Sequence, residues 1–472
     1  MPLTIPGVTP RASRARGAEM AAQSSSPRPP QPEMPKLDDA PGLPARRLAA
    51  AVIDEVLRAR VALDETLERM LPESGLDAAD ASLARAITVT AFRRLGTIQQ
   101  AIDARLDRGS PRKSGPFEPI VTAAAAQILF LDVPDHAAVD IAIRQLHEDP
   151  RSARYAALGN AVLRRLARER DAVLAEAQAE VFGDTPDWLI ESWCTAYGED
   201  TAAAIAQSHR EEPPLDLSVK ADPAGWAEKL DGIALPIGSV RLRERQAIAG
   251  LPGFDEGDWW VQDAAAALPV KLLAPKPGER IADLCAAPGG KTAQIAAAGA
   301  HVTALDRSGP RLRRLKANLA RLGLSAEVVT ADAVTWKAEA FDAVLLDAPC
   351  SATGTIRRHP DVAWTKLPED RDRLAALQAR LFDAAAALTK PGGRLVYCTC
   401  SLEPQEGEEQ TEAFLARNPQ FRREPVQPAE IGGLTDAIDA NGDIRTLPHQ
   451  LQGETPRLSG WAGFYATRLI RL

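Results

Sequence analysis

Several features are scarce in this chain of 472 residues, and each scarcity excludes a class of protein. The chain has only five cysteines, an odd number, which argues against a disulfide-stapled scaffold and favours a reducing compartment. No run of about 18 apolar residues occurs, so we expect no membrane-spanning segment. The early arginines are followed by serine and proline rather than by an apolar stretch, so we expect no secretory signal and a cytoplasmic location.

An excess of positive charge is missing as well. The chain has 56 lysines and arginines against 64 aspartates and glutamates, a formal net charge of −8. Proteins that coat nucleic acid are usually basic, so this balance argues against a simple electrostatic binder but leaves room for a local basic groove. At this length a single compact core is not expected, and we predict two or three domains.

The composition and the spacing of apolar residues divide the chain into four segments. Residues 1–44 hold ten of the 37 prolines together with serine and arginine, which predicts a disordered tail. In residues 45–171 apolar side chains recur every three or four positions, which predicts an all-α domain. Residues 172–235 predict a linker and a small α+β connector, since apolar and polar residues alternate over 215–219. Residues 236–472 alternate short apolar runs with helical segments, which predicts an α/β domain with a doubly wound, mostly parallel sheet.

A glycine-rich turn at residues 283–292 follows the first predicted strand of the α/β domain and reads Asp-Leu-Cys-Ala-Ala-Pro-Gly-Gly-Lys-Thr. A phosphate-binding P-loop would need glycine where Cys285 stands, and the Gly-x-Gly-x-x-Gly pattern of dinucleotide sites is absent. Asp306 ends the next predicted strand, where a carboxylate can accept both hydroxyls of a ribose. Asp332 ends the third strand, where it can receive an adenine amino group. Together these residues predict an adenosyl ligand without phosphates, such as S-adenosylmethionine, and a plain strand-to-helix turn is the alternative.

Two cysteine-containing segments end the fourth and fifth predicted strands. The first is Asp-Ala-Pro-Cys-Ser, with Asp347 and Cys350, and the second is Tyr-Cys-Thr-Cys-Ser, with Cys398 and Cys400. We interpret Cys398 as a small buried side chain, whereas Cys350 and Cys400 lie at the mouths of adjacent strands beside the predicted cofactor. A Cys-x-Cys metal site would need further cysteine or histidine ligands, and the downstream histidines lack ligand spacing, so we expect no metal.

Methylation of a pyrimidine at C5 is the chemistry that needs a thiol beside a methyl donor. C5 is a poor nucleophile until a thiolate adds to C6 and breaks the aromaticity of the ring. A carboxylic acid near N3 would stabilise the charge that this addition pushes onto the ring, and Asp347 is the candidate. The base must also leave its stack, so unpaired RNA is the substrate that costs least.

Two further clusters could contact such a substrate. Arg357, Arg358 and His359 follow the first cysteine segment, and cationic side chains there suit the phosphates that flank a target base. The alternative for this cluster is an ordinary solvated loop. Trp259 and Trp260 could stack on a base, and packing in a core or between domains is the other interpretation.

These motifs resemble, in content and in order, the Sun (RsmB-type) branch of the RNA cytosine-C5 methyltransferases, and the match covers most of the chain. The segments that carry the resemblance are 262–263, 283–292, 347–354, 357–361 and 398–401. Two patches of the helical region, 135–139 and 159–165, also resemble NusB-like RNA-binding domains. The resemblance implies an all-α NusB-like domain, a small connector and a Rossmann-like class I methyltransferase domain that acts on small-subunit (16S) rRNA.

The resemblance also implies roles for single residues. Cys400 would be the nucleophile and Cys350 would assist product release, a choice that the order of the strands leaves open. RNA would be the partner of a monomeric enzyme, with the basic cluster at 357–359 among its contacts. The residues expected to contact S-adenosylmethionine are Cys285, Ala286, Ala287, Pro288, Gly289, Gly290, Lys291, Asp306, Asp332 and Asp347.

Two other functions stay open at this point. The same chemistry could act on tRNA or another RNA, since only the NusB-like patches point to rRNA. A protein without catalysis could instead bind RNA through its helical domain as a ribosome-assembly or antitermination factor. The retained thiols and carboxylates argue against this second alternative.

Overall fold

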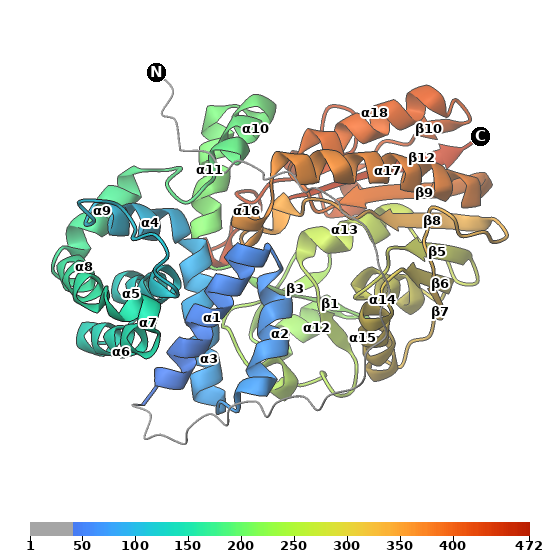
Figure 1. The fold of residues 1–472 in the computed structure, drawn as a ribbon. Helices are drawn as coiled ribbons and strands as arrows, with labels where there is room; N and C mark the ends of the chain where they lie inside the picture. Colours follow the sequence, from blue (N-terminus) through green and yellow to red (C-terminus); the bar gives the residue numbers. More distant parts are fainter. Residues whose placement is uncertain (1–40) are drawn as a thin grey trace, which may run out of the picture. The chain divides into compact units, whose positions relative to one another are not determined.

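The computed structural model describes residues 41–472, so almost all of the tail predicted for residues 1–44 lies outside the described residues. An all-α region comes first, as predicted, and α5 lies at its centre (Figure 1). Helix α5 is buried on nearly all sides, because the run of small side chains from Ala123 to Ala126 lets α1, α3, α6 and α8 approach it. The helices of this region are α1 (Leu43–Ala59), α2 (Leu63–Ser74), α3 (Ala78–Arg93), α4 (Leu95–Asp103), α5 (Phe117–Phe130), α6 (Asp135–Glu148), α7 (Pro150–Ala153), α8 (Ala156–Arg168) and α9 (Arg170–Ala179).

A small antiparallel sheet with strand order β2-β3-β1-β4 follows two more helices. Strands β3 and β4 lie in the range predicted for the α/β domain, but both pair with β1, where Leu217 stands opposite Val240 on one side and Val261 on the other. The small sheet therefore reaches Val261 instead of ending near residue 235. Its elements and the preceding helices are α10 (Asp187–Tyr197), α11 (Glu199–Arg210), β1 (Leu215–Val219), α12 (Pro223–Lys229), β2 (Gly232–Ala234), β3 (Ser239–Leu242) and β4 (Trp259–Val261).

The main sheet has the strand order β10-β12-β9-β8-β5-β6-β7, with β11 also paired to β12. Strands β9, β8, β5, β6 and β7 are parallel to one another, and the others are antiparallel, which confirms the predicted doubly wound, mostly parallel sheet. The strands are β5 (Arg280–Leu284), β6 (His301–Asp306), β7 (Glu327–Thr330), β8 (Phe341–Asp347), β9 (Thr389–Thr399), β10 (Phe421–Arg423), β11 (Ile444–Thr446) and β12 (Phe464–Arg471).

Helices cover both faces of this sheet, because alternate residues of each strand point to opposite sides. Val396 packs with α13 and α14 in one core, whereas its neighbour Tyr397 stacks on Phe382 of α17 in the other. Figure 1 shows α17 and α18 on one side of β9 and α13 on the other. The helices are α13 (Ala264–Leu273), α14 (Gly290–Ala297), α15 (Gly309–Arg321), α16 (Val362–Thr365), α17 (Pro368–Leu388) and α18 (Glu408–Arg417). Within residues 41–472, no helix has the length and apolar character needed to cross a membrane.

Candidate active site

The two cysteine segments meet at the carboxyl edge of the main sheet. Strands β8 and β9 are parallel neighbours, with Asp347 in register with Cys398, so the residues that follow them leave the sheet side by side. The Sγ atoms of Cys350 and Cys400 are 3.5 Å apart, and both side chains are partly exposed. Cys398 is fully buried in β9 with its thiol 3.5 Å from a carboxylate oxygen of Asp347, in agreement with its interpretation as a small buried side chain.

Glu406 ties the two cysteine segments together. Its buried carboxylate accepts hydrogen bonds from the amide of Ser351 at 2.9 Å, from the Ser351 hydroxyl and from the Gln378 amide at 3.1 Å. Its carbonyl oxygen accepts bonds from the Tyr397 hydroxyl at 2.7 Å and from the Thr399 hydroxyl at 3.2 Å. One residue therefore holds both the loop that carries Cys350 and the strand that leads to Cys400.

Other bonds join the two loops directly. The Ser351 and Ser401 hydroxyls lie 3.1 Å apart, and the Gly354 amide donates to the Cys400 carbonyl at 3.0 Å. These groups are buried, where an unpaired polar atom costs about 1–3 kcal/mol, so the network favours one arrangement of the loops.

Helix α10 anchors the far side of the Cys400 loop. Trp193 donates from Nε1 to Glu403 at 3.0 Å, Ser192 donates to the same carboxylate, and Tyr197 donates to the Leu402 carbonyl. Sequence reasoning missed this anchor, and it also missed Glu406. The signal that could have found both is the presence of two glutamates, Glu403 and Glu406, within six residues after the second cysteine.

A buried cation stands beside the thiols. Lys291 Nζ is 2.8 Å from Asp347 Oδ2, and the lysine side chain is only 10% exposed. Burial lowers the pKa of Lys291, but the opposing effects of Asp347, Cys398 and Cys400 are larger and raise the pKa above its usual value. The ammonium group therefore stays charged, and its field favours a thiolate nearby. The hydrogen bond to Cys400, and then burial, raise the pKa of the Cys350 thiol.

The predicted cofactor turn lies between β5 and α14. Asp306, at the end of β6, is buried and accepts hydrogen bonds from the amides of Ala287 at 3.2 Å and Ser308 at 2.8 Å. Gly289 has a φ of +105°, and a Cβ there would lie 2.8 Å from Leu315, so only glycine fits this turn against α15.

The turn fits an adenosyl group. Oδ1 of Asp283 is buried without a hydrogen-bond partner, and burial raises the pKa of this carboxyl to about 7. Asp306 ends β6, and Asp332 is exposed two residues after β7, so carboxylates stand at the ends of consecutive strands. Such a donor set suits ribose hydroxyls and an amino group better than phosphates. Among residues 41–472, no group of three or more histidines, cysteines or carboxylates is arranged to hold a metal ion.

Arg357 is not the exposed phosphate contact that the sequence predicted. It is 4% exposed, and its guanidinium donates to the carbonyls of Glu212 at 2.8 Å and Pro456 at 3.1 Å, with Ser459 as a further acceptor. Burial lowers its pKa to about 10. This side chain joins three segments of the fold and is almost fully buried, which argues against the predicted RNA contact at Arg357.

The neighbouring residues of the cluster remain partly exposed. Arg358 is paired with Asp263 at 2.9 Å and is 28% exposed, and His359 lies 3.0 Å from Asp64 of α2 with 38% exposure. For these two residues the RNA contact stays a prediction. The two tryptophans are buried in the small sheet: Trp259 donates to the Pro252 carbonyl and Trp260 to Gln262. Their role is packing, the second of the two interpretations.

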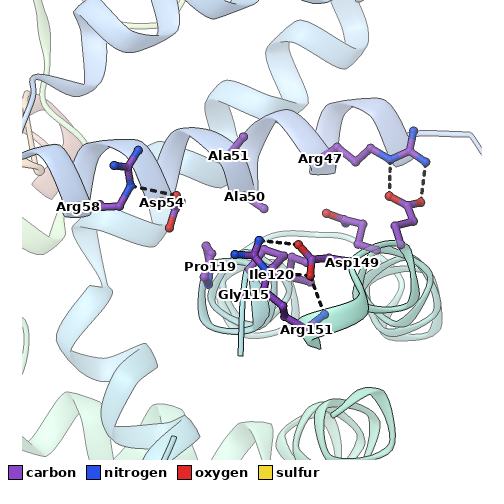
Figure 2. Close-up of a pocket in the computed structure, with 13 residues that line it drawn as sticks. Arg47, Ala50, Ala51, Asp54, Arg58, Gly115, Pro119, Ile120, Asp149 and Arg151 are labelled. Carbon is purple, nitrogen blue, oxygen red and sulfur yellow. Dashed lines mark hydrogen bonds and ion pairs between the residues drawn. The ribbon is translucent and has the colours of Figure 1, made fainter. Parts of the chain in front are cut away.

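A separate pocket of about 550 Å³ lies in the helical domain, among α1, α5, α6 and α7 (Figure 2). Arg47 pairs with Glu148 at 2.6 Å, and Arg151 pairs with Asp149 at 2.7 Å. The charges that line the pocket thus neutralise one another, and none of its lining residues belongs to the site with the two thiols.

Comparisons with known proteins agree with this geometry. Residues 270–465 match the family model described as "16S rRNA methyltransferase RsmB/F", and residues 43–168 match the NusB family. The chain is 35% identical over 454 residues to ribosomal RNA small subunit methyltransferase B of Cronobacter sakazakii, covering 90% of this chain and 98% of that protein. It is 36% identical over 408 residues to the protein of the same name from Vibrio cholerae, covering 82% and 92%.

A solved structure extends the comparison to the fold. The methyltransferase homolog protein from Pyrococcus horikoshii superposes with a TM-score of 0.50 at 26% identity, covering 61% of this chain and 95% of that chain. The motifs, the parallel sheet and the long matches to relatives lead to one assignment. The chain belongs to the RsmB/F family of 16S rRNA methyltransferases, and it is an S-adenosylmethionine-dependent RNA methyltransferase with an N-terminal NusB domain.

Proposed function

We propose that the enzyme methylates C5 of a cytosine in small-subunit (16S) rRNA through a covalent bond between Cys400 and C6 of the base. The observation that carries the proposal is the 3.5 Å separation of the Cys350 and Cys400 sulfurs at the ends of adjacent strands, beside a buried lysine. When bound, S-adenosylmethionine supplies an electrophilic methyl group for C5.

The proposed cofactor contacts are those expected from the sequence. Asp306 would hold the ribose hydroxyls and Asp332 the adenine amino group. In support of these roles, Asp306 ends β6 and Asp332 follows the neighbouring strand β7. Lys291 would orient Asp347 at the edge of the pocket. The remaining contacts come from the turn itself: Cys285, Ala286, Ala287, Pro288, Gly289 and Gly290.

In the proposed reaction Cys400 adds to C6 as a thiolate, forming an S–C6 bond and pushing an electron pair of the ring toward N3. Asp347, as an acid near N3, would stabilise that charge, and C5 becomes nucleophilic. After methylation a base removes the C5 proton, and the electron pair of that C–H bond forms the C5–C6 double bond as Cys400 leaves as a thiolate. The S–C6 bond breaks in this step and the aromatic ring is restored. Cys350, which contacts the Cys400 sulfur, would assist this release.

RNA is the proposed partner, and the NusB domain is a proposed site for part of its binding. The relatives named ribosomal RNA small subunit methyltransferase B support rRNA over tRNA as the substrate. A cytoplasmic location stays part of the proposal. We also propose that the enzyme acts as a monomer.

The test is methylation by the purified full-length enzyme of a 16S rRNA transcript and of tRNA, each mapped by bisulfite sequencing. We expect 5-methylcytidine at one position of the rRNA and none in the tRNA. Cys400→Ala should give no product, whereas Cys194→Ala, which removes a thiol on α10 away from the cysteine pair, should retain activity. Methylation of the tRNA alone would show that tRNA, and not rRNA, is the substrate. Full activity of Cys400→Ala would refute the proposed nucleophile.

A further inference from the structure

Helix α2 of the helical domain presents two carboxylates to an arginine and a histidine of the catalytic domain. Asp64 Oδ2 lies 3.0 Å from His359 Nδ1, and Glu68 Oε2 lies 2.5 Å from a guanidinium nitrogen of Arg314. Residues four apart share one face of a helix and are about 6 Å apart along it. One face of α2 therefore joins the loop after β8 to helix α15.

The two side chains belong to elements that carry different parts of the site. His359 lies on the loop that begins at Cys350, where its amide donates to the Thr355 carbonyl. Arg314 lies three residues after Arg311, which donates to the Ala287 carbonyl in the predicted cofactor turn. His359 thus belongs to the loop of Cys350, and Arg314 belongs to the helix that contacts the cofactor turn.

The ion pairs are weak, although α2 itself is firmly held. The Leu63 amide, at the start of α2, donates to a buried oxygen of Asp361 at 3.0 Å, which fixes the helix against the catalytic domain. The four paired side chains are 38% to 56% exposed, and pairs of that exposure contribute about 0–1 kcal/mol. A nucleic-acid phosphate competes well for such cations, because its binding also releases condensed counterions.

We propose that Arg314 and His359 bind backbone phosphates of the RNA strand next to the target base. Glu68 and Asp64 hold these side chains in the protein without RNA, and the phosphates replace them while α2 stays in place. This inference rests on the proposed function for its substrate, but its subsites lie outside the groups that perform the chemistry.

The test measures the affinity of the full-length enzyme for a fluorescent single-stranded fragment of 16S rRNA over a series of KCl concentrations. Arg314→Gln should weaken binding and reduce the slope of log K against log salt by about 0.7, the value for one lost phosphate contact on a single strand. Glu68→Gln should tighten binding about twofold to fivefold at low salt, since the competing carboxylate is gone. Asp64→Asn should act in the same direction as Glu68→Gln.

Glu65→Gln is the matched control for charge. Glu65 is exposed on the same helix and forms no ion pair with another residue of the described part of the chain, so its substitution should leave affinity unchanged. Equal effects of Glu68→Gln and Glu65→Gln, or an unchanged salt slope for Arg314→Gln, would overturn the inference. Methylation assayed on the same wild-type preparation separates the two proposals, because a failure of the subsites leaves 5-methylcytidine formation intact.

Discussion

The helical domain and the catalytic edge of the main sheet place their polar groups differently. Around α5 the core is alanine, leucine and isoleucine, and ion pairs such as Arg47 with Glu148 lie at the surface, 33% and 43% exposed. At the catalytic edge Lys291, Asp283 and Glu406 are themselves buried. An apolar core tolerates small changes in its side chains. A network of buried hydrogen bonds and ion pairs does not tolerate the loss of one partner. Single polar substitutions should therefore have large effects at the catalytic edge and small effects at the exposed ion pairs of the helical domain.

The largest expected effect is that of Asp347→Ala. It leaves the buried Lys291 ammonium without its partner, which should lower the free energy of unfolding by about 3 kcal/mol and abolish methylation. Asp342→Ala is the control, because Asp342 lies on the same strand and pairs with Lys390, whose side chain is 40% exposed. Urea denaturation should show a loss below about 1 kcal/mol for this second variant. Equal losses would contradict the distinction between the buried and the exposed pair.

Glu406→Gln should lower the methylation rate about 100-fold, a typical result of misplacing reactive groups by about 1 Å. The substitution keeps the size of the side chain but weakens its hold on Ser351, so the two sulfurs lose their fixed separation. Glu409→Gln, an exposed change on α18, should leave the rate unchanged. Steady-state kinetics of both variants, with thermal melts to verify folding, checks this prediction. A wild-type methylation rate for Glu406→Gln would show that Glu406 does not position the two cysteines.

Arg357→Ala sharpens the comparison within the basic cluster. Loss of this guanidinium removes its hydrogen bonds to carbonyls of two distant segments, which should lower the free energy of unfolding by about 2 kcal/mol. The salt slope of RNA binding should stay at the wild-type value, because the Arg357 side chain is almost fully buried. An Arg357→Ala variant with unchanged stability and a reduced salt slope would instead support the predicted phosphate contact at Arg357.

The smallest expected effect is that of Arg47→Ala in the helical domain. The pair with Glu148 is partly exposed, so chemical denaturation should show a loss below about 1 kcal/mol, with methylation unchanged. A loss of several kcal/mol would show that this domain also depends on individual polar contacts.

The sequence predicted those parts of the fold that depend on local patterns. Alternating apolar runs and helices indicate a parallel sheet, and parallel neighbours deliver their carboxyl ends to one edge, so the meeting of Cys350 and Cys400 could be anticipated. The cofactor turn was likewise marked by its own residues, including Gly289.

What the sequence could not predict depends on contacts between distant segments. The acceptors of Arg357 lie 145 and 99 residues away, so no local pattern indicates that this arginine is buried. Pairing of β3 and β4 with β1 is also a long-range choice, and it explains why Trp259 packs in a sheet instead of stacking on a base. The role of Glu406 appears only when both cysteine segments are seen together.

Trapping of a covalent protein–RNA adduct tests the assignment of the two cysteines most directly. Full-length enzyme, labelled 16S rRNA fragment and S-adenosylmethionine are combined and resolved on a denaturing gel. We predict a persistent adduct for Cys350→Ala, because the S–C6 bond forms but release fails, and no adduct for Cys400→Ala or for the double variant. An adduct formed by Cys400→Ala, or its absence in an inactive Cys350→Ala enzyme, would contradict the account.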